Sequence, residues 1–142
     1  MKLKLDFPKV NFKCPELTNV WGDPVIGEHT EVGAFVEIGR DVVIGKGCLL
    51  QAYVFLCPGV VLGNNVFIGP GTIFCNDKYP PSDNLEGVIV EDDVVIGAGC
   101  IILPGIHISS GVRIGAGVLV RCNVNPSTKW IKSTQNEEPN WP

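Results

Sequence analysis

The chain has 142 residues, of which 45% are apolar and 18% charged, and its formal net charge is -4. This composition excludes a disordered chain, and the acidic balance gives no footprint for nucleic-acid binding. No apolar run approaches the length of a transmembrane helix, and the opening MKLKLDFPKV has no signal-peptide core. We therefore expect a single cytoplasmic domain with no nucleic-acid or membrane partner.

A repeat begins near residue 20, and we expect residues 1–19 to form an extended N-terminal segment before it. From there on, an apolar residue, usually branched, returns at every sixth position. These positions are Val20, Ile26, Val32, Ile38, Ile44, Leu50, Leu56, Leu62, Ile68 and Phe74, and then Val90, Ile96, Ile102, Ile108, Ile114 and Val120.

A six-residue period does not fit an α-helix, on which successive apolar residues would lie about 240° apart. A continuous strand fits poorly because glycine recurs too often, with 17 glycines in the chain. A unit of short strand and turn does fit, since its first and fifth residues point inward and a glycine turns the corner. Three such units close a triangular coil, which predicts an all-β protein, a hexapeptide-repeat parallel β-helix over residues 20–124.

The repeat is interrupted once, between Phe74 and Val90, by ten more residues than the regular step. The inserted stretch is polar and contains proline, and no aliphatic residue lies where an inward position would fall. We therefore expect one loop, over about residues 77–87, to protrude from a corner of the coil. A long loop on an otherwise economical solenoid is more often functional than accidental.

Residues 125–142 follow the last repeat, and we expect them to form a tail that caps the coil. Trp130 and Trp141 would cover the last open rung, whose strand edges would otherwise be free to pair with another chain.

Six cysteines are spread along the chain, with no C-x-x-C motif and no spacing typical of a zinc site. Three disulfides are one interpretation. We favour reduced thiols, because the repeat places Cys48 and Cys100 at inward positions and a cytoplasmic protein keeps its thiols reduced.

Two stretches flank and include the interruption: IGPGTIFCNDKYP (68–80) and VIVEDDVVIGAGCIILPGIHI (88–108). They resemble hexapeptide-repeat acyltransferases, and are most similar to N-acetyltransferases that act on nucleotide-linked 3-amino-3-deoxysugars. The last strand before the loop in that family reads F-x-N, as do Phe74, Cys75 and Asn76 here. The rung with Gln51 also resembles the family, whereas the C-terminal tail lacks its V-x-G-x-P-A-[RK] sequence.

This resemblance implies a left-handed coil and a homotrimer, with acetyl-CoA in the groove between neighbouring chains and the sugar near the loop. The glycine-rich corner at Gly97 and Ala98 would hold the thioester carbonyl through a backbone amide, with Gly115 and Ala116 on the next rung. Arg121 would meet the phosphates of the cofactor, although an ordinary charged surface explains it equally well. No metal is implied.

Acetyl transfer to a sugar amine needs little more than positioning, and Asn76 suits that task. Its side-chain carbonyl would accept a proton of the amine and aim the lone pair at the thioester; the alternative is that it only caps the loop. His107 should point outward and could serve as a base at a neighbour's Asn76 corner, or be a surface histidine without a role. Near the sugar we expect Gln51, Asp77, Lys78 and Tyr79, the last three of which could instead be a solvated loop tip.

Two other classes of function compete with this one. A metal enzyme resembling the γ-class carbonic anhydrases would need three histidine ligands, and the chain has only His29 and His107. A non-catalytic trimeric scaffold or binding protein remains the alternative to an acetyl-CoA-dependent N-acetyltransferase.

Overall fold

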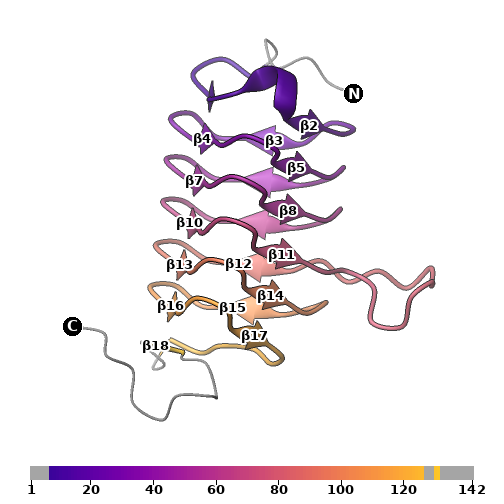
Figure 1. Ribbon diagram of the computed structural model, residues 1–142. Helices are drawn as coiled ribbons and strands as arrows, with labels where there is room; N and C mark the ends of the chain where they lie inside the picture. The colour runs from indigo at the N-terminus through magenta and orange to yellow at the C-terminus, as the bar shows by residue number, and fades with distance from the viewer. Residues whose placement is uncertain (1–6, 127–129, 132–142) are drawn as a thin grey trace.

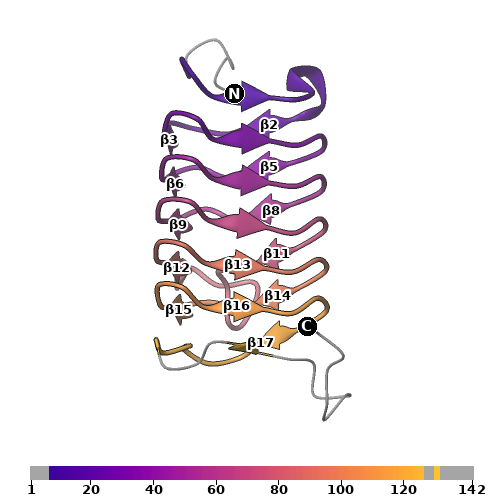
Figure 2. The same ribbon diagram turned by 90° about the vertical axis from the view of Figure 1, so that its left-hand side faces the viewer.

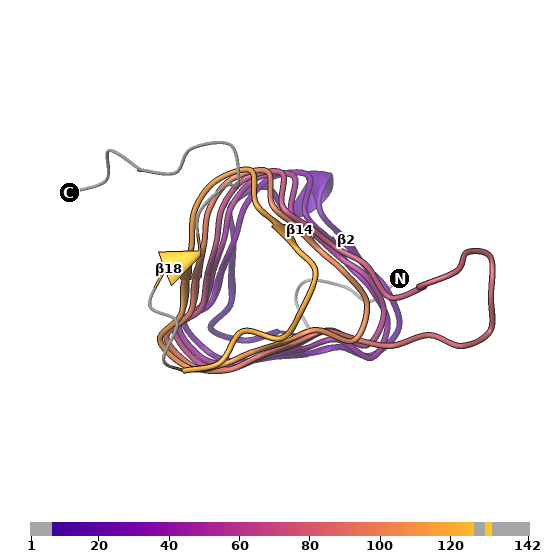
Figure 3. The ribbon, with the colours of Figure 1, turned by 90° about the horizontal axis from the view of Figure 1, so that it is seen from below.

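The structure is a computed structural model that describes residues 7–126 and 130–131. Within these residues the chain forms eighteen two-residue strands and one short 3-10 helix, η2 (Pro15–Leu17), with no α-helix. The strands form three parallel sheets, which are the sides of a triangular coil (Figures 1 and 3). No helix in this part of the chain is long and apolar enough to cross a membrane.

Successive strands are shared among the three sheets in rotation. Sheet A, seen face-on in Figure 2, contains β1 (Asn11–Phe12), β4 (Glu31–Val32), β7 (Leu49–Leu50), β10 (Phe67–Ile68), β13 (Val95–Ile96), β16 (Arg113–Ile114) and β18 (Trp130–Ile131). Sheet B contains β2 (Asn19–Val20), β5 (Glu37–Ile38), β8 (Phe55–Leu56), β11 (Ile73–Phe74), β14 (Ile101–Ile102) and β17 (Leu119–Val120). Sheet C contains β3 (Val25–Ile26), β6 (Val43–Ile44), β9 (Val61–Leu62), β12 (Ile89–Val90) and β15 (His107–Ile108).

The chain passes from sheet A to B to C and back, and we name the edges the A–B, B–C and C–A corners. Seen from the C-terminal end in Figure 3, it turns clockwise while it advances toward the viewer, so the coil is left-handed. The expected left-handed parallel β-helix with one protruding loop is confirmed.

The core is the row of residues that the six-residue period singled out. Each is the second residue of its strand, and all except Ile26 are buried. Three inward positions hold buried threonine, Thr18, Thr30 and Thr72, and the last two make equivalent hydrogen bonds. The Thr30 hydroxyl donates to the carbonyl of Gly45 (2.9 Å) and accepts from the amide of Cys48 (3.1 Å), and Thr72 makes an equivalent pair of bonds further along. Because both hydroxyls are satisfied, the core holds them at little cost.

Glycine is required at the corners for two different reasons. At Gly69, on the A–B corner, an added Cβ would lie 2.5 Å from the backbone nitrogen of Ala98 on the next rung. Gly71, two residues on, has φ +71 with nothing within 4 Å of such a Cβ. The first glycine permits close stacking of rungs, and the second permits a left-handed backbone.

The loop leaves the B–C corner after β11 and returns before β12, as Figure 3 shows. Its ends are joined by an antiparallel bridge between Asp77 and Leu85 and by a bond from the Glu86 amide to the carbonyl of Asn76 (2.7 Å). Beyond it β12 pairs with β9 in the regular register, so the insertion leaves the coil in phase.

We expect Gly69→Ala to lower the midpoint of thermal unfolding by several degrees, because the methyl group forces two rungs apart and costs more than about 1 kcal/mol. The control is Gly71→Asn, which places in open space a residue that tolerates a left-handed backbone, as Asn65 already does at φ 55. It should unfold within a degree or two of the wild type. Equal losses in the two variants would contradict the close-stacking explanation.

Candidate functional site

The base of the loop is organised by the carboxylate of Asp77. It accepts hydrogen bonds from the Ser82 hydroxyl (2.7 Å) and from the amides of Ser82 (2.7 Å) and Tyr79 (3.1 Å). The Ser82 hydroxyl, aided by these amides, holds the pKa of Asp77 below its ordinary value. Both oxygens of this expected substrate contact are thus engaged within the loop, while Tyr79 is largely exposed.

Asn76 is the last residue before the loop, and its side chain is held from one side only. Its Nδ2 donates to the carbonyl oxygen of Pro58 on the preceding rung (3.1 Å), and its own carbonyl accepts from the Glu86 amide. Its Oδ1 has no hydrogen-bond partner among the described residues. The half-buried side chain is therefore fixed in orientation with a free acceptor, which is the arrangement needed to receive an N–H group.

A cleft of about 420 Å³ lies between the loop and the two following rungs at the B–C corner. Asp77, Lys78 and Glu86 line it from the loop, and Arg121 lines it from the last rung. Two cations and two anions face this space, so it suits a polar ligand that carries both donors and acceptors. We call it the loop cleft.

The A–B corner presents a strip of bare backbone. Its three successive turns at Pro70–Gly71, Ala98–Gly99 and Ala116–Gly117 carry no side chain larger than a proline ring, and an added Cβ on any of these glycines would meet nothing within 4 Å. The amides of Ala98 and Ala116 make no hydrogen bond within the described part of the chain. At the C–A corner, by contrast, the amide of Lys46 is capped by a side chain.

His107 lies on the outer side of β15 and is paired with Glu91. Its Nε2 is 2.8 Å from Oε1 of Glu91, whose other oxygen accepts from the amide of Ser110 (2.8 Å). The Ser110 amide, together with His107, holds the pKa of Glu91 below its ordinary value, so the carboxylate stays charged. Asn123 in turn accepts from the backbone amide of His107 (2.9 Å).

Glu91 was missed by the sequence reasoning. It precedes His107 by sixteen residues, whereas residues directly above one another, such as Ile89 and His107, are eighteen apart. Outward residues on neighbouring rungs at this offset are diagonal neighbours, and this spacing is the signal that would have found the pair.

The structure brings only some of the expected site residues together. Asn76, Asp77, Lys78 and Arg121 gather at the B–C corner, although Arg121 was expected to serve the cofactor. The other group occupies the A–B corner, on the far side of sheet B: Gln51, Gly97, Ala98, Gly115 and Ala116. His107 lies on sheet C, next to the loop cleft but not lining it.

Two cysteines line the loop cleft, the exposed Cys122 and the partly buried Cys75. All six are free thiols, and Cys48 and Cys100 are buried as predicted. Burial, together with the nearby Cys75, raises the pKa of Cys57 to about 12, and burial also raises the pKa of Cys75, which lines the cleft. Because the thiolate is the reactive form, Cys75 is poorly suited to forming an acyl-enzyme. Among the described residues no three metal-ligating side chains converge.

We expect an alkylating reagent at pH 8 to modify the exposed Cys122 rapidly and to leave Cys57 unmodified until the chain unfolds. A thiol with a pKa of about 12 is almost entirely protonated at that pH, and burial blocks access as well. Mass spectrometry of digested protein gives the extent of modification at each residue. Early labelling of Cys57 in folded protein would contradict this account of the corner.

Models of two hexapeptide repeats match the chain. The one described as bacterial transferase hexapeptide (six repeats) matches residues 23–58 and 41–76, and the hexapeptide repeat of succinyl-transferase matches residues 87–122. The matched segments stop and resume on either side of the loop, and together they span more than half of the chain.

Curated relatives of the chain are longer proteins. A 2,3,4,5-tetrahydropyridine-2,6-dicarboxylate N-acetyltransferase from Halalkalibacterium halodurans is 39% identical over 110 residues, covering 73% of this chain and 45% of its own. The bifunctional protein GlmU from Desulfitobacterium hafniense is 30% identical over 172 residues, covering 87% of this chain and 36% of its own. The chain thus spans less than half the length of these relatives.

Solved structures share the coil. The acetyltransferase domain of PglB from Neisseria gonorrhoeae, in complex with acetyl coenzyme A, superposes with a TM-score of 0.69 at 19% identity, over 82% of this chain and 51% of that one. A mutant of AntD, an N-acyltransferase from Bacillus cereus, in complex with dTDP-4-amino-4,6-dideoxyglucose and coenzyme A, gives a TM-score of 0.54 at 24% identity, over 83% of this chain and 70% of that one. The repeat matched on both sides of the loop, on a coil of this kind, shows that the chain belongs to the hexapeptide-repeat acyltransferase family.

Proposed function

We propose that this chain is an acetyl-CoA-dependent N-acetyltransferase that acts on a nucleotide-linked aminosugar. The observation that carries the proposal is the Oδ1 of Asn76, which has no hydrogen-bond partner among the described residues and is held in place by the bond from Nδ2 to Pro58. The two residues on either side of Asn76, Cys75 and Asp77, line the loop cleft. Relatives named as N-acetyltransferases support the type of reaction, and the dTDP-linked aminosugar bound to AntD supports the class of acceptor.

The acceptor amine would bind with one N–H directed at Oδ1 of Asn76. This bond leaves the nitrogen lone pair free to point away from Asn76 and toward the thioester carbon. The lone pair forms the C–N bond, the C–S bond breaks, and the amine proton is lost as CoA leaves as its thiol. Holding the two reactants in this geometry supplies on the order of 7–11 kcal/mol, so no covalent intermediate on Cys75 is required.

The acetyl donor would lie along the bare strip at the A–B corner. The amides of Ala98 and Ala116 have no hydrogen-bond partner among the described residues, and a thioester oxygen that gains negative charge during the reaction would be stabilised by one of them. Because the three stacked turns at Gly71, Gly99 and Gly117 carry no bulky side chain, the extended arm of the cofactor has room to lie against the backbone.

Donor and acceptor would meet only between two chains. Within one chain, the bare strip and Asn76 lie at opposite edges of sheet B. Outward residues on the last three strands of that sheet form an apolar row that is 41 to 47% exposed: Ile73, Ile101 and Leu119. Such a row favours a protein contact, and a head-to-tail contact that joins different corners of identical chains closes into a ring, here a homotrimer.

His107 and Glu91 provide the competing arrangement for the same reaction. A histidine held by a carboxylate is a suitable general base, and Nδ1 of His107 has no partner among the described residues. If a neighbour's Asn76 faces this pair, His107 would remove the proton of the amine.

We expect Asn76→Ala to lower kcat/KM for acetylation of a nucleotide-linked aminosugar at least about tenfold, since the lost positioning bond contributes about 1 kcal/mol or more. Release of CoA measures the rate, and calorimetry with acetyl-CoA should give unchanged affinity. Asn84→Ala, in the same loop but exposed, is the matched control and should retain activity.

His107→Ala and Glu91→Gln separate the two arrangements. If these variants abolish turnover while Asn76→Ala does not, the reaction belongs to the His107–Glu91 pair. Failure of the unaltered chain to bind acetyl-CoA would instead favour the non-catalytic scaffold.

We expect light scattering at micromolar concentration to give three times the mass of one chain. Ile101→Lys places a charge in the apolar row of sheet B and should reduce the assembly to monomers without unfolding it. Leu49→Lys makes the same change on sheet A, at a residue of similar exposure, and should leave the trimer intact. A monomeric unaltered chain would refute the trimer together with a site shared between chains.

A further inference from the structure

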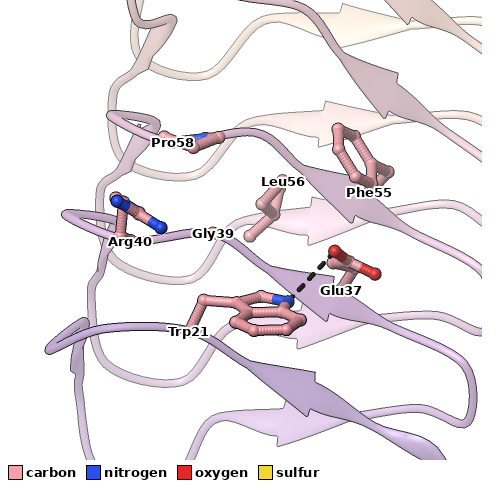
Figure 4. Close-up of a pocket in the computed structure, with 7 residues that line it drawn as sticks. All are labelled: Trp21, Glu37, Gly39, Arg40, Phe55, Leu56 and Pro58. Atoms are coloured by element: carbon pink, nitrogen blue, oxygen red, sulfur yellow. Dashed lines mark hydrogen bonds between the residues drawn. The ribbon is translucent and has the colours of Figure 1, made fainter. Parts of the chain in front are cut away.

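A second hollow, of about 300 Å³, lies on sheet B before the loop. It spans the first three rungs of the sheet next to the B–C corner, and Figure 4 shows it framed by Trp21, Arg40, Phe55 and Pro58, with Glu37 beside it. We call it the sheet B hollow. Neither the bare strip nor the loop cleft includes any of these residues.

Two aromatic side chains are exposed in the sheet B hollow, and one of them is fixed in place. Trp21 is 41% exposed and Phe55 38% exposed. The indole Nε1 of Trp21 donates to Oε1 of Glu37 (3.1 Å), and the other oxygen of Glu37 accepts from Asn19 (3.5 Å). A ring held in this way offers a flat apolar surface for another planar ring. Because the indole is already ordered in the free protein, a ligand that binds there does not have to pay the entropy cost of fixing it.

Arg40 supplies a cation that nothing in the described part of the chain neutralises. Its side chain is exposed, makes no ion pair or hydrogen bond with these residues, and in Figure 4 lies at the corner side of the hollow. A free guanidinium beside apolar rings is suited to a phosphate, which it binds through two parallel hydrogen bonds. The anionic Glu37 lies away from Arg40, over the sheet, so a ligand's charge would be directed to the corner.

The sheet B hollow continues into the Asn76 site. Pro58 lines the hollow, and its carbonyl oxygen accepts the hydrogen bond from Nδ2 of Asn76. Arg40 and Asn76 occupy the same corner two rungs apart, which corresponds to about 10 Å along the coil. Aromatic rings, a free cation and a free amide oxygen therefore follow one another along one edge of the protein.

We propose that the sheet B hollow binds the nucleoside phosphate part of a ligand, with the base against Trp21 and Phe55 and the phosphate on Arg40. The order of the aromatic rings, Arg40 and Asn76 along the edge matches the order of base, phosphate and sugar in a nucleotide-linked sugar. The placement of the sugar at Asn76 rests on the proposed function. Binding of the nucleotide itself depends only on the hollow.

The test is calorimetric titration of the full chain with UMP, dTMP and GMP, compared with uridine and ribose 5-phosphate. AMP is left out because CoA itself carries an adenine nucleotide. We expect at least one nucleotide to bind, and uridine and ribose 5-phosphate to bind about tenfold more weakly than that nucleotide or worse. If none of the three nucleotides binds at millimolar concentration, the proposal is overturned.

Variants locate the binding. Arg40→Gln should weaken binding of the nucleotide about tenfold and leave the nucleoside unaffected, and Trp21→Ala should weaken both. Arg113→Gln removes an exposed arginine from sheet A and should change neither. Nucleotide binding that is unaffected by Arg40→Gln and Trp21→Ala would place the ligand elsewhere and also overturn the proposal.

Acetyl-CoA titration of the same samples separates this inference from the proposed function. A chain that binds acetyl-CoA but no nucleotide retains its function as a transferase and refutes the sheet B hollow. A chain that binds a nucleotide through Arg40 but shows no affinity for acetyl-CoA supports the hollow and refutes the transferase.

Discussion

The hydrogen bonds between two-residue strands on successive rungs are the interaction on which the rest of this structure depends. Each strand is too short to be stable alone, and the pairing, for example of Phe67 with Val95, sets the distance at which every inward side chain meets the next. That distance is small, so the corner residue after each strand has little room beside the rung above. The period of the sequence follows from this geometry, because each side of the triangle needs one inward pair and one tight corner.

The three corners of the triangle share this geometry but differ in what covers the backbone. Side chains cap amides at the C–A corner, where Asn64 accepts from Lys46 and Asp92 accepts from Asn64. At the A–B corner no described residue caps the amides of Ala98 and Ala116, and at the B–C corner the coil opens into the loop. A symmetrical backbone thus has chemically different edges, and the proposed donor and acceptor sites use the two edges that are not closed by side chains.

Most of the fold could be predicted because a strict period leaves few alternatives. The N-terminal part shows where that reasoning ends: β1 joins sheet A, but the step from Phe12 to Val20 is eight positions instead of six, and η2 accommodates the longer step. At the candidate site the position of Asn76 follows from the period, whereas its bond to Pro58 and the engagement of Asp77 by Ser82 depend on local backbone geometry that no period encodes. The Glu91–His107 pair was missed because a rule for residues directly above one another does not consider diagonals.

The loop is closed at its own base, by Asp77 with Leu85 and by Asn76 with Glu86, and the coil beyond it keeps its register. Its length and composition are therefore almost independent of the scaffold that carries it. Under the proposed function, a lineage that replaced these eleven or so residues could change the acceptor while inheriting the coil and the proposed donor edge unaltered. Specificity in such a protein evolves as an exchangeable module, and the selection that preserves the solenoid need not constrain it.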